Sequence, residues 1–376
     1  TGIGSRTSRL GYASSDDGLH FKRMSVPVFY PADDSQKELE NPGGCEDPRV
    51  AVTEDGLYVM HYTQWNRKQA RLAVATSRDL QTWENHGPAF AKAYNGRFID
   101  EFSKSASIVT QLIDGKQVIA KIDGKYWMYW GEKFVNVATS TDLVNWEPML
   151  DENGEFLKVM TPRAGKFDSD LTECGPPAIL TDKGILLLYN GKNKSGAEGD
   201  TLYTANSYCA GQALFDAKNP TKLIDRLDKP FYIPESDFEK SGQYPAGTVF
   251  IEGLVFYNQK WFLYFLNRKQ NLHRMQILCK SPDLHGVQDV KMALESKNGG
   301  YDRWWIMLII AIISIAFGVL CIVNAFGMVK LAMQFVGAAL IYDGISDLWV
   351  VTKTVRTVKD MEQEAKAVDV DYKEID

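Results

Sequence analysis

The stretch Gly44-Cys45-Glu46-Asp47-Pro48-Arg49-Val50 brings a carboxyl group, a turn-forming residue and a cation together within three positions. Asp47 in this setting can serve as a catalytic acid or as the ion-pair partner of Arg49. An ion pair would lower the pKa of Asp47 and oppose an acid role, and Asp before Pro is also a frequent turn. The motif alone therefore leaves a catalytic and a structural interpretation open.

Composition argues against several other classes of site. The net charge of -6 disfavours a nucleic-acid-binding surface. The five cysteines are scattered and form no CxxC pair, which argues against a zinc site, and we expect no metal and no cofactor. Aromatic residues make up 12% of the chain, which suits β-strands and also suits carbohydrate binding.

The elements that must position such a site are short strands. Residues 1 to about 265 contain no long helical pattern, and turn residues repeatedly precede apolar runs, which predicts hairpins. These turns are Glu54-Asp55-Gly56, Asp123-Gly124-Lys125, Asp182-Lys183-Gly184 and Asn258-Gln259-Lys260.

A second motif recurs along the same region. Thr76 to Glu84 and Thr139 to Glu147 share the pattern Ser-x-Asp-Leu-x-x-Trp at a spacing of 63 residues, and Ser14 to Phe21 resembles both. A period of this length with two hairpins indicates a four-stranded unit, and such units stacked in a ring form a β-propeller. We interpret the motif as a structural turn between strands rather than a substrate contact.

The last part of the chain differs in kind. Residues 304–326 form an almost unbroken apolar run, and a second run covers residues 331–351 with Asp343 and Asp347 inside it. Runs of this length predict two transmembrane helices, although the two acids make the second span weaker. A buried pair of soluble helices is the alternative.

Flanking charges give this hairpin a predicted orientation. The cations outside the two runs are Arg303, Lys353, Arg356 and Lys359, whereas the loop between the runs carries only Lys330. The positive-inside rule then places both ends of the hairpin in the cytoplasm. We expect the acidic segment from Asp360 to Asp376 to be a solvated helix or disordered.

Several motifs in the first 265 residues resemble glycoside hydrolase family 130. They are Thr7 to Ala13, Gly44 to Val50, Glu173-Cys174-Gly175-Pro176-Pro177-Ala178, Gly211 to Asp216, Pro230 to Glu235 and Phe250 to Val255. The resemblance implies a five-bladed β-propeller that acts on β-mannosides, either by hydrolysis or by phosphorolysis. It also implies that Asp47 is the catalytic acid.

Charge near the motifs favours water over phosphate as the acceptor. A phosphate dianion requires Lys, Arg or His around it. Asp170 and Glu173 stand where the phosphorylases of this family supply a Lys, and Asn190 stands where they supply a His. We therefore predict a hydrolase of β-1,2-linked manno-oligosaccharides that works by inversion, with the phosphorylase as the alternative.

An inverting hydrolase needs a carboxylate that activates water. The resemblance offers Glu173 and Glu252 for this role, and either one can instead bind sugar hydroxyls or orient an arginine. Further predicted substrate-binding residues are Arg9, Arg49, Lys104, Asn190 and Tyr244. Trp65 and Trp130 can stack on sugar, but core packing is the simpler interpretation.

The sequence also departs from the family pattern. The strand pattern stops after Phe265, where the family has a Tyr-Gly-x-Ala-Asp stretch, and the start of the first blade is missing. The propeller is therefore expected to be truncated or incompletely closed. An inactive, membrane-tethered sugar-binding propeller is a further alternative.

The tail resembles the HdeD-like small membrane protein family through Gly318-Val319-Leu320 and Gly337 to Ile345. The predicted organisation is a propeller over 1–265, an irregular junction over 266–300, two transmembrane helices over 301–352 and an acidic tail over 353–376. The expected location is a bacterial inner membrane, with the propeller periplasmic by resemblance or cytoplasmic by the charge rule. The expected partners are an oligosaccharide and the membrane.

Overall fold

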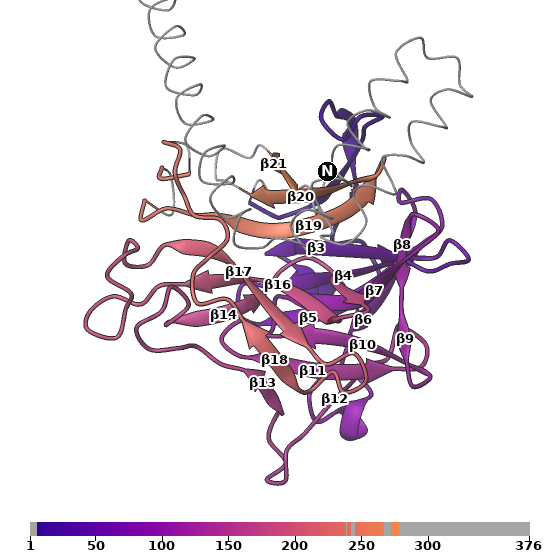
Figure 1. The fold of residues 1–376 in the computed structure, drawn as a ribbon. Helices are drawn as coiled ribbons and strands as arrows, with labels where there is room; N and C mark the ends of the chain where they lie inside the picture. Colours follow the sequence, from indigo (N-terminus) through magenta and orange to yellow (C-terminus); the bar gives the residue numbers. More distant parts are fainter. Residues whose placement is uncertain (1–5, 238, 242–244, 267–271, 278–376) are drawn as a thin grey trace, which may run out of the picture. The chain divides into compact units, whose positions relative to one another are not determined.

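The computed structural model divides the chain into two compact units, Thr1–Cys279 and Lys280–Asp376. The structure describes residues 6–237, 239–241, 245–266 and 272–277, all in the first unit (Figure 1). These residues are almost entirely strands and turns, with one short α-helix, α1 (Lys37–Glu40), and one 3₁₀ turn, η1 (Ala93–Gly96). The prediction of an all-β fold is confirmed.

The strands form repeated antiparallel groups. A two-stranded sheet contains β1 (Leu10–Ser14) and β2 (Lys22–Phe29), and a four-stranded sheet contains β3 (Gly44–Val52), β4 (Tyr58–Trp65), β5 (Ala70–Ser77) and β6 (Trp83–Pro88). A three-stranded sheet contains β19 (Phe250–Tyr257), β20 (Lys260–Leu266) and β21 (Leu272–Ile277).

The remaining sheet has 12 strands and consists of two such groups. One contains β7 (Ala106–Ile113), β8 (Lys116–Ile119), β9 (Lys121–Ile122), β10 (Lys125–Trp130), β11 (Val135–Ser140), β12 (Glu147–Pro148) and β13 (Lys158–Met160). The other contains β14 (Leu171–Cys174), β15 (Ala178–Thr181), β16 (Gly184–Lys192), β17 (Tyr208–Phe215) and β18 (Leu223–Arg226). The parallel pairing of β7 with β15 joins them. Repeated groups of this kind suit a propeller, while the number of five blades stays a prediction.

The repeated Ser-x-Asp-Leu-x-x-Trp motif forms the same turn wherever it occurs. In the turn from β11 to β12, the Ser140 hydroxyl accepts the Leu143 amide at 2.9 Å, and Trp146 donates from its indole to the Leu143 carbonyl at 3.0 Å. Leu143 has a positive φ of 69°, which these bonds hold in place. The turn from β5 to β6 repeats these contacts, so the structural interpretation of the motif is confirmed.

The four predicted hairpin turns are also confirmed. They connect β3 to β4, β9 to β10, β15 to β16 and β19 to β20. The strands they join bury large side chains, among them Trp130, Tyr62 and Tyr189. Neighbouring strand groups share these cores, since Val59 of β4 and Ile108 of β7 belong to one buried cluster.

The turn between β1 and β2 contacts strands β19 and β20. The Tyr257 hydroxyl donates to the Asp16 carbonyl at 2.8 Å, and the Tyr264 hydroxyl donates to the Gly18 carbonyl at 3.1 Å. Figure 1 shows the orange strands β19 and β20 beside the indigo start of the chain. Strand β21 lies beyond the predicted boundary at residue 265 and pairs with β20, so the predicted junction begins with a further strand.

No helix within the described residues is long and apolar enough to cross a membrane. The predicted transmembrane hairpin over 301–352 and the acidic tail over 353–376 lie outside the described residues. Both stay predictions.

Candidate active site

Arg49 lies at the point where several strand groups meet. Its side chain is only 2% exposed, and its donors are directed at backbone carbonyls. Nε donates to Gly175 at 3.2 Å and Nη2 to Cys174 at 3.4 Å. Nη1 donates to Asp47 at 2.9 Å and to Lys104 at 3.3 Å. A buried guanidinium that satisfies four carbonyls fixes the ends of β3, β7 and β14 relative to one another.

Asp47 is placed by an irregularity in β3. The pairing of β3 with β4 shifts between Glu46 and Arg49, and Asp47 has a positive φ of 49°. A bulge of this kind changes the direction of a side chain, which would otherwise alternate with its neighbours between the two faces of the sheet. The Asp47 Oδ2 atom lies 3.5 Å from the Thr63 hydroxyl, which also contacts the Lys104 carbonyl at 3.1 Å.

Glu252 is placed by a second irregularity, in β19. The pairing of β19 with β20 shifts between Ile251 and Gly253, so Glu252 is the extra residue. Its Oε1 atom lies 3.7 Å from Arg49 Nη2 and is buried without a hydrogen-bond partner. Burial raises the pKa of Glu252 to about 7, against the opposing effect of Arg49.

Glu173 has a carboxylate neighbour that the sequence analysis did not find. The Thr172 amide donates to the Lys133 carbonyl and the Cys174 amide donates to the Gly131 carbonyl, each at 3.3 Å. These two bonds run in antiparallel order and set Glu173 beside Glu132. Glu132 lies two residues after the end of the aromatic strand β10, and an acid so close to the end of such a strand is the signal that could have identified it.

Burial raises the pKa of both neighbours. Glu173 is 7% exposed, and burial raises its pKa well above the ordinary value, with a further contribution from Glu132. Burial raises the pKa of Glu132 to about 7, although Lys104 lowers it. Adjacent carboxylates in low dielectric share protons, because both cannot hold a negative charge. Asp47, Glu132, Glu173 and Glu252 are referred to below as the four-carboxylate site.

Positive charge at the site is limited. His61 pairs with Arg49 in the β3–β4 register, but burial lowers the pKa of His61 to about 3 and keeps it neutral. Lys104 lies 3.9 Å from Glu46 through its Nζ atom and 5.8 Å from the ring centre of the half-buried Trp65. No group of three or more His, Cys, Asp or Glu among the described residues is arranged to hold a metal ion.

The other predicted site residues fall in different places. Asn190 is fully buried, and both ends of its side-chain amide bind the backbone of Ile251. Arg9 is exposed immediately before β1, and Trp130 is buried against Phe90 and Phe156 in the core. Tyr244 lies outside the described residues. The structure thus brings Asp47, Arg49, Lys104, Glu173 and Glu252 together, and it gives Asn190 no free polar group for a sugar.

Comparison with known proteins identifies the family. A family model described as beta-1,4-mannooligosaccharide phosphorylase matches residues 4–265. The chain belongs to glycoside hydrolase family 130. It is 31% identical over 265 residues to a 1,2-beta-oligomannan phosphorylase of Thermoanaerobacter sp. (strain X514), covering 70% of this chain and 76% of the relative. The family resemblance of the first 265 residues is confirmed.

Some solved structures have a higher sequence identity to this chain. A presumed glycosidase from Bacteroides thetaiotaomicron is 88% identical with a TM-score of 0.71, covering 73% of this chain and 79% of that one. A second structure, 62% identical with a TM-score of 0.72 and covering 75% and 78%, comes from work on family 130 glycoside hydrolases that target β-1,2 mannosidic linkages in Candida mannan. These matches support a β-mannoside-active family, but the predicted hydrolytic activity is not confirmed, since the family model and curated relatives carry the names of phosphorylases.

The comparisons do not show the HdeD-like resemblance of the tail, which stays a prediction.

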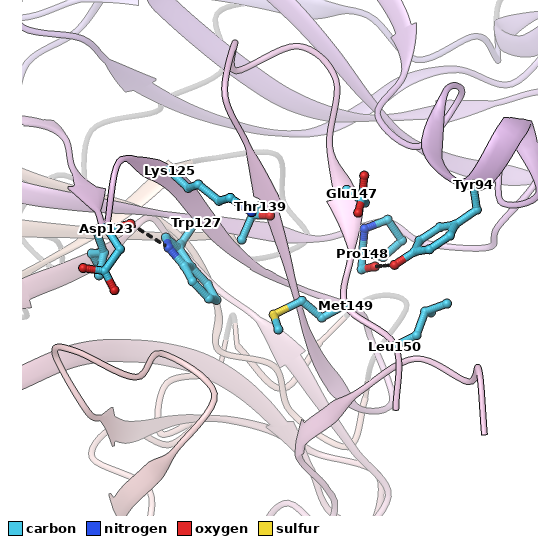
Figure 2. Close-up of a pocket in the computed structure, with 10 residues that line it drawn as sticks. Tyr94, Asp123, Lys125, Trp127, Thr139, Glu147, Pro148, Met149 and Leu150 are labelled. Atoms are coloured by element: carbon cyan, nitrogen blue, oxygen red, sulfur yellow. Dashed lines mark hydrogen bonds between the residues drawn. The ribbon is translucent and has the colours of Figure 1, made fainter. Parts of the chain in front are cut away.

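The comparisons assign no role to the cavities of this family 130 chain. A cavity of about 490 Å³ lies between η1 and strands β10–β12. Figure 2 shows residues that line it, among them Tyr94, Trp127 and Met149. Another cavity of about 530 Å³ is lined by residues of β13 and β18. Neither shares a residue with the four-carboxylate site.

Proposed function

We propose that this family 130 chain hydrolyses β-1,2-linked mannosides by an inverting acid–base mechanism. The observation that carries the proposal is the position of the half-buried Glu132 beside the buried Glu173, two carboxylates with raised pKa. Relatives supply the linkage: curated phosphorylases at 31% and 30% identity and a solved structure at 62% identity all carry names that refer to β-1,2-linked mannosides.

In the proposed reaction, Asp47 donates a proton to the glycosidic oxygen as the bond to the anomeric carbon breaks. Glu132 and Glu173 hold one proton between them, so one carboxylate remains ionised and accepts a proton from water. The hydroxide oxygen bonds to the anomeric carbon from the opposite face, and the product is α-mannose. Arg49 binds the backbone carbonyls of Asp47 and of Cys174, the residue after Glu173, which keeps the acid and the base in fixed positions.

Charge supports water rather than phosphate as the acceptor. A phosphate dianion needs several directed cations, and two adjacent carboxylates repel it. The donors of Arg49 are engaged by carbonyls, and Lys104 lies near the carboxylate of Glu46. His61 is neutral and adds no positive charge.

Phosphorolysis is the second candidate. The family model and the curated relatives bear phosphorylase names, and by those names they favour phosphorolysis over hydrolysis. Lys104 and Arg49 would then be the cations that receive phosphate. An inactive sugar-binding protein is the third candidate, and no specific contact in the four-carboxylate site favours it.

Product analysis separates the three candidates. β-1,2-Mannobiose is incubated with the full chain in phosphate-free buffer and in buffer with 10 mM phosphate (about physiological concentration), and products are followed by proton NMR. Hydrolysis predicts mannose in both buffers, released first as the α-anomer. Mannose 1-phosphate formed only with phosphate would establish the phosphorylase instead. Binding without any turnover, unchanged in Asp47→Asn, would establish the inactive binder.

A further inference from the structure

Asn190 makes an unusual connection between two strand groups. It lies on β16 and is fully buried. Its Oδ1 atom accepts the Ile251 amide at 2.7 Å, and its Nδ2 atom donates to the Ile251 carbonyl at 3.1 Å. Strands β16 and β19 belong to different sheets, so this side chain supplies both backbone bonds that a neighbouring strand would otherwise supply.

The two ends of this connection are next to two members of the four-carboxylate site. Asn190 is opposite Glu173 in the pairing of β14 with β16. Ile251 directly precedes Glu252, at the point where β19 loses register with β20. One side chain therefore stands between the strand that carries Glu173 and the bulge that carries Glu252.

We propose that Asn190 is a positioning residue that sets the separation between Glu173 and the Glu252–Arg49 pair. The proposal rests on the proposed function and gives Asn190 no contact with sugar. An amide suits the role because it donates and accepts at once in a fixed plane. An ionised carboxylate only accepts and would repel the Ile251 carbonyl, and a leucine of similar shape makes neither bond.

The bulge explains why this position matters for activity. A bulge leaves its extra residue without ladder bonds, so Glu252 depends on its neighbours for orientation. Without the two bonds to Ile251, β19 gains freedom at the residue before Glu252. A displacement of about 1 Å in a catalytic arrangement can lower turnover by about 100-fold.

The test compares Asn190→Leu and Asn190→Asp with a matched control, Thr110→Val. Thr110 is also buried, and its hydroxyl donates to the Ala178 carbonyl at 2.7 Å, which ties β7 to β15 away from the four carboxylates. We expect Asn190→Leu to lower kcat by about 10- to 100-fold with little change in KM. Thr110→Val is expected to lower the melting temperature and to leave kcat as in the wild type.

The pH dependence of kcat in Asn190→Asp would not change if the role of Asn190 were purely structural. A protonated carboxyl group has one donor and one acceptor and can reproduce both bonds, whereas the ionised form cannot. The kcat of Asn190→Asp, divided by that of the wild type at each pH, should therefore rise as the pH falls. This variant also serves if Asn190→Leu does not fold.

Two results would overturn the proposal. One is a wild-type kcat and pH profile in both variants with only a lower melting temperature, which would make Asn190 merely structural. The other is a raised KM at unchanged kcat, which would make it a sugar ligand. The kcat of each variant is divided by the kcat of the wild type, measured on whichever product the wild type forms. A finding of phosphorolysis would therefore refute the proposed hydrolysis without deciding the role of Asn190.

Discussion

Asp168 and Glu173 are both buried, yet the two carboxylates have opposite surroundings. Asp168 accepts hydrogen bonds from Arg163 at 2.8 Å, Arg226 at 2.5 Å and the Tyr189 hydroxyl at 2.7 Å. Its charge is matched by two guanidinium groups, and its oxygens are satisfied. Such a cluster is a structural element, whose charges compensate each other.

The four-carboxylate site lacks this balance. Four acids surround one buried arginine, and that arginine directs its donors to carbonyls. Oε1 atoms of Glu132 and Glu252 are buried without partners. The difference teaches that burial alone does not identify a catalytic carboxylate. A carboxylate that is buried without cations and donors to match its charge has a raised pKa, and such a group can exchange protons near neutral pH.

The largest expected effect is on turnover by Glu173→Gln. The amide keeps the shape of the side chain but cannot accept a proton from water, so we expect kcat to fall by about 10²- to 10⁴-fold. The melting temperature should not fall, since an uncompensated buried acid is removed. Steady-state kinetics and thermal unfolding check this, with the exposed Glu147→Gln as control. Wild-type turnover in Glu173→Gln would contradict the assignment.

Asp168→Asn should show the reverse pattern. Removing one charge from a buried, compensated cluster leaves Arg226 without its carboxylate partner and Arg163 with only the exposed Asp228, and we expect the free energy of unfolding to fall by about 3–5 kcal/mol. The kcat of the folded protein should stay at the wild-type value. Chemical denaturation and active-site-normalised kinetics measure the two quantities. A loss of kcat at unchanged stability would remove the contrast between the clusters.

The pH dependence of stability should come from the uncompensated cluster. The pKa of Glu252 is raised from 4.5 to about 7 in the folded protein. The folded state then holds a proton that the unfolded state releases, so its stability is full below pH 4.5 and is lost as the pH rises towards 7. Glu252→Gln should flatten the decline by up to about 1.4 kcal/mol per pH unit. Denaturation curves at several pH values test this, and an unchanged slope would argue against it.

The smallest effect is expected at the contact between the β1–β2 turn and strand β19. Tyr257→Phe removes the neutral, exposed hydrogen bond to the Asp16 carbonyl. Such a bond contributes about 1 kcal/mol or less, and kcat should not change. Thermal unfolding measures it and provides the baseline against which the two ionic clusters are compared. A loss of several kcal/mol would mean that this contact carries more of the fold than its geometry suggests.

Local features of the fold could be predicted from the sequence. The turn at Ser140 and the Asp55-Gly56 hairpin depend on residues within a few positions, so pattern alone identifies them. The all-β class follows from their repetition. Strand β21 was missed because residues 272–277 alternate only weakly, and pairing with β20 decides their structure.

The candidate site could be predicted only in part. Asp47, Glu173 and Glu252 stand in recognisable motifs and come together around Arg49. Glu132 was missed because its neighbourhood depends on contacts between residues about 40 positions apart. Asn190 was placed in the site by its position along the chain, but only the structure shows that Ile251 occupies its amide.

The central claim is that the Glu132–Glu173 pair activates the acceptor water, and azide rescue tests it most directly. Glu132→Ala, Glu173→Ala and Glu252→Ala are each assayed on β-1,2-mannobiose with and without sodium azide, and products are examined by NMR. When the base of an inverting enzyme is removed, azide can enter the space and attack the anomeric carbon from the face that water would use. The prediction is α-mannosyl azide and faster substrate loss in Glu132→Ala or Glu173→Ala, with none in the wild type. Rescue confined to Glu252→Ala, or the absence of rescue in all three variants, would contradict the account.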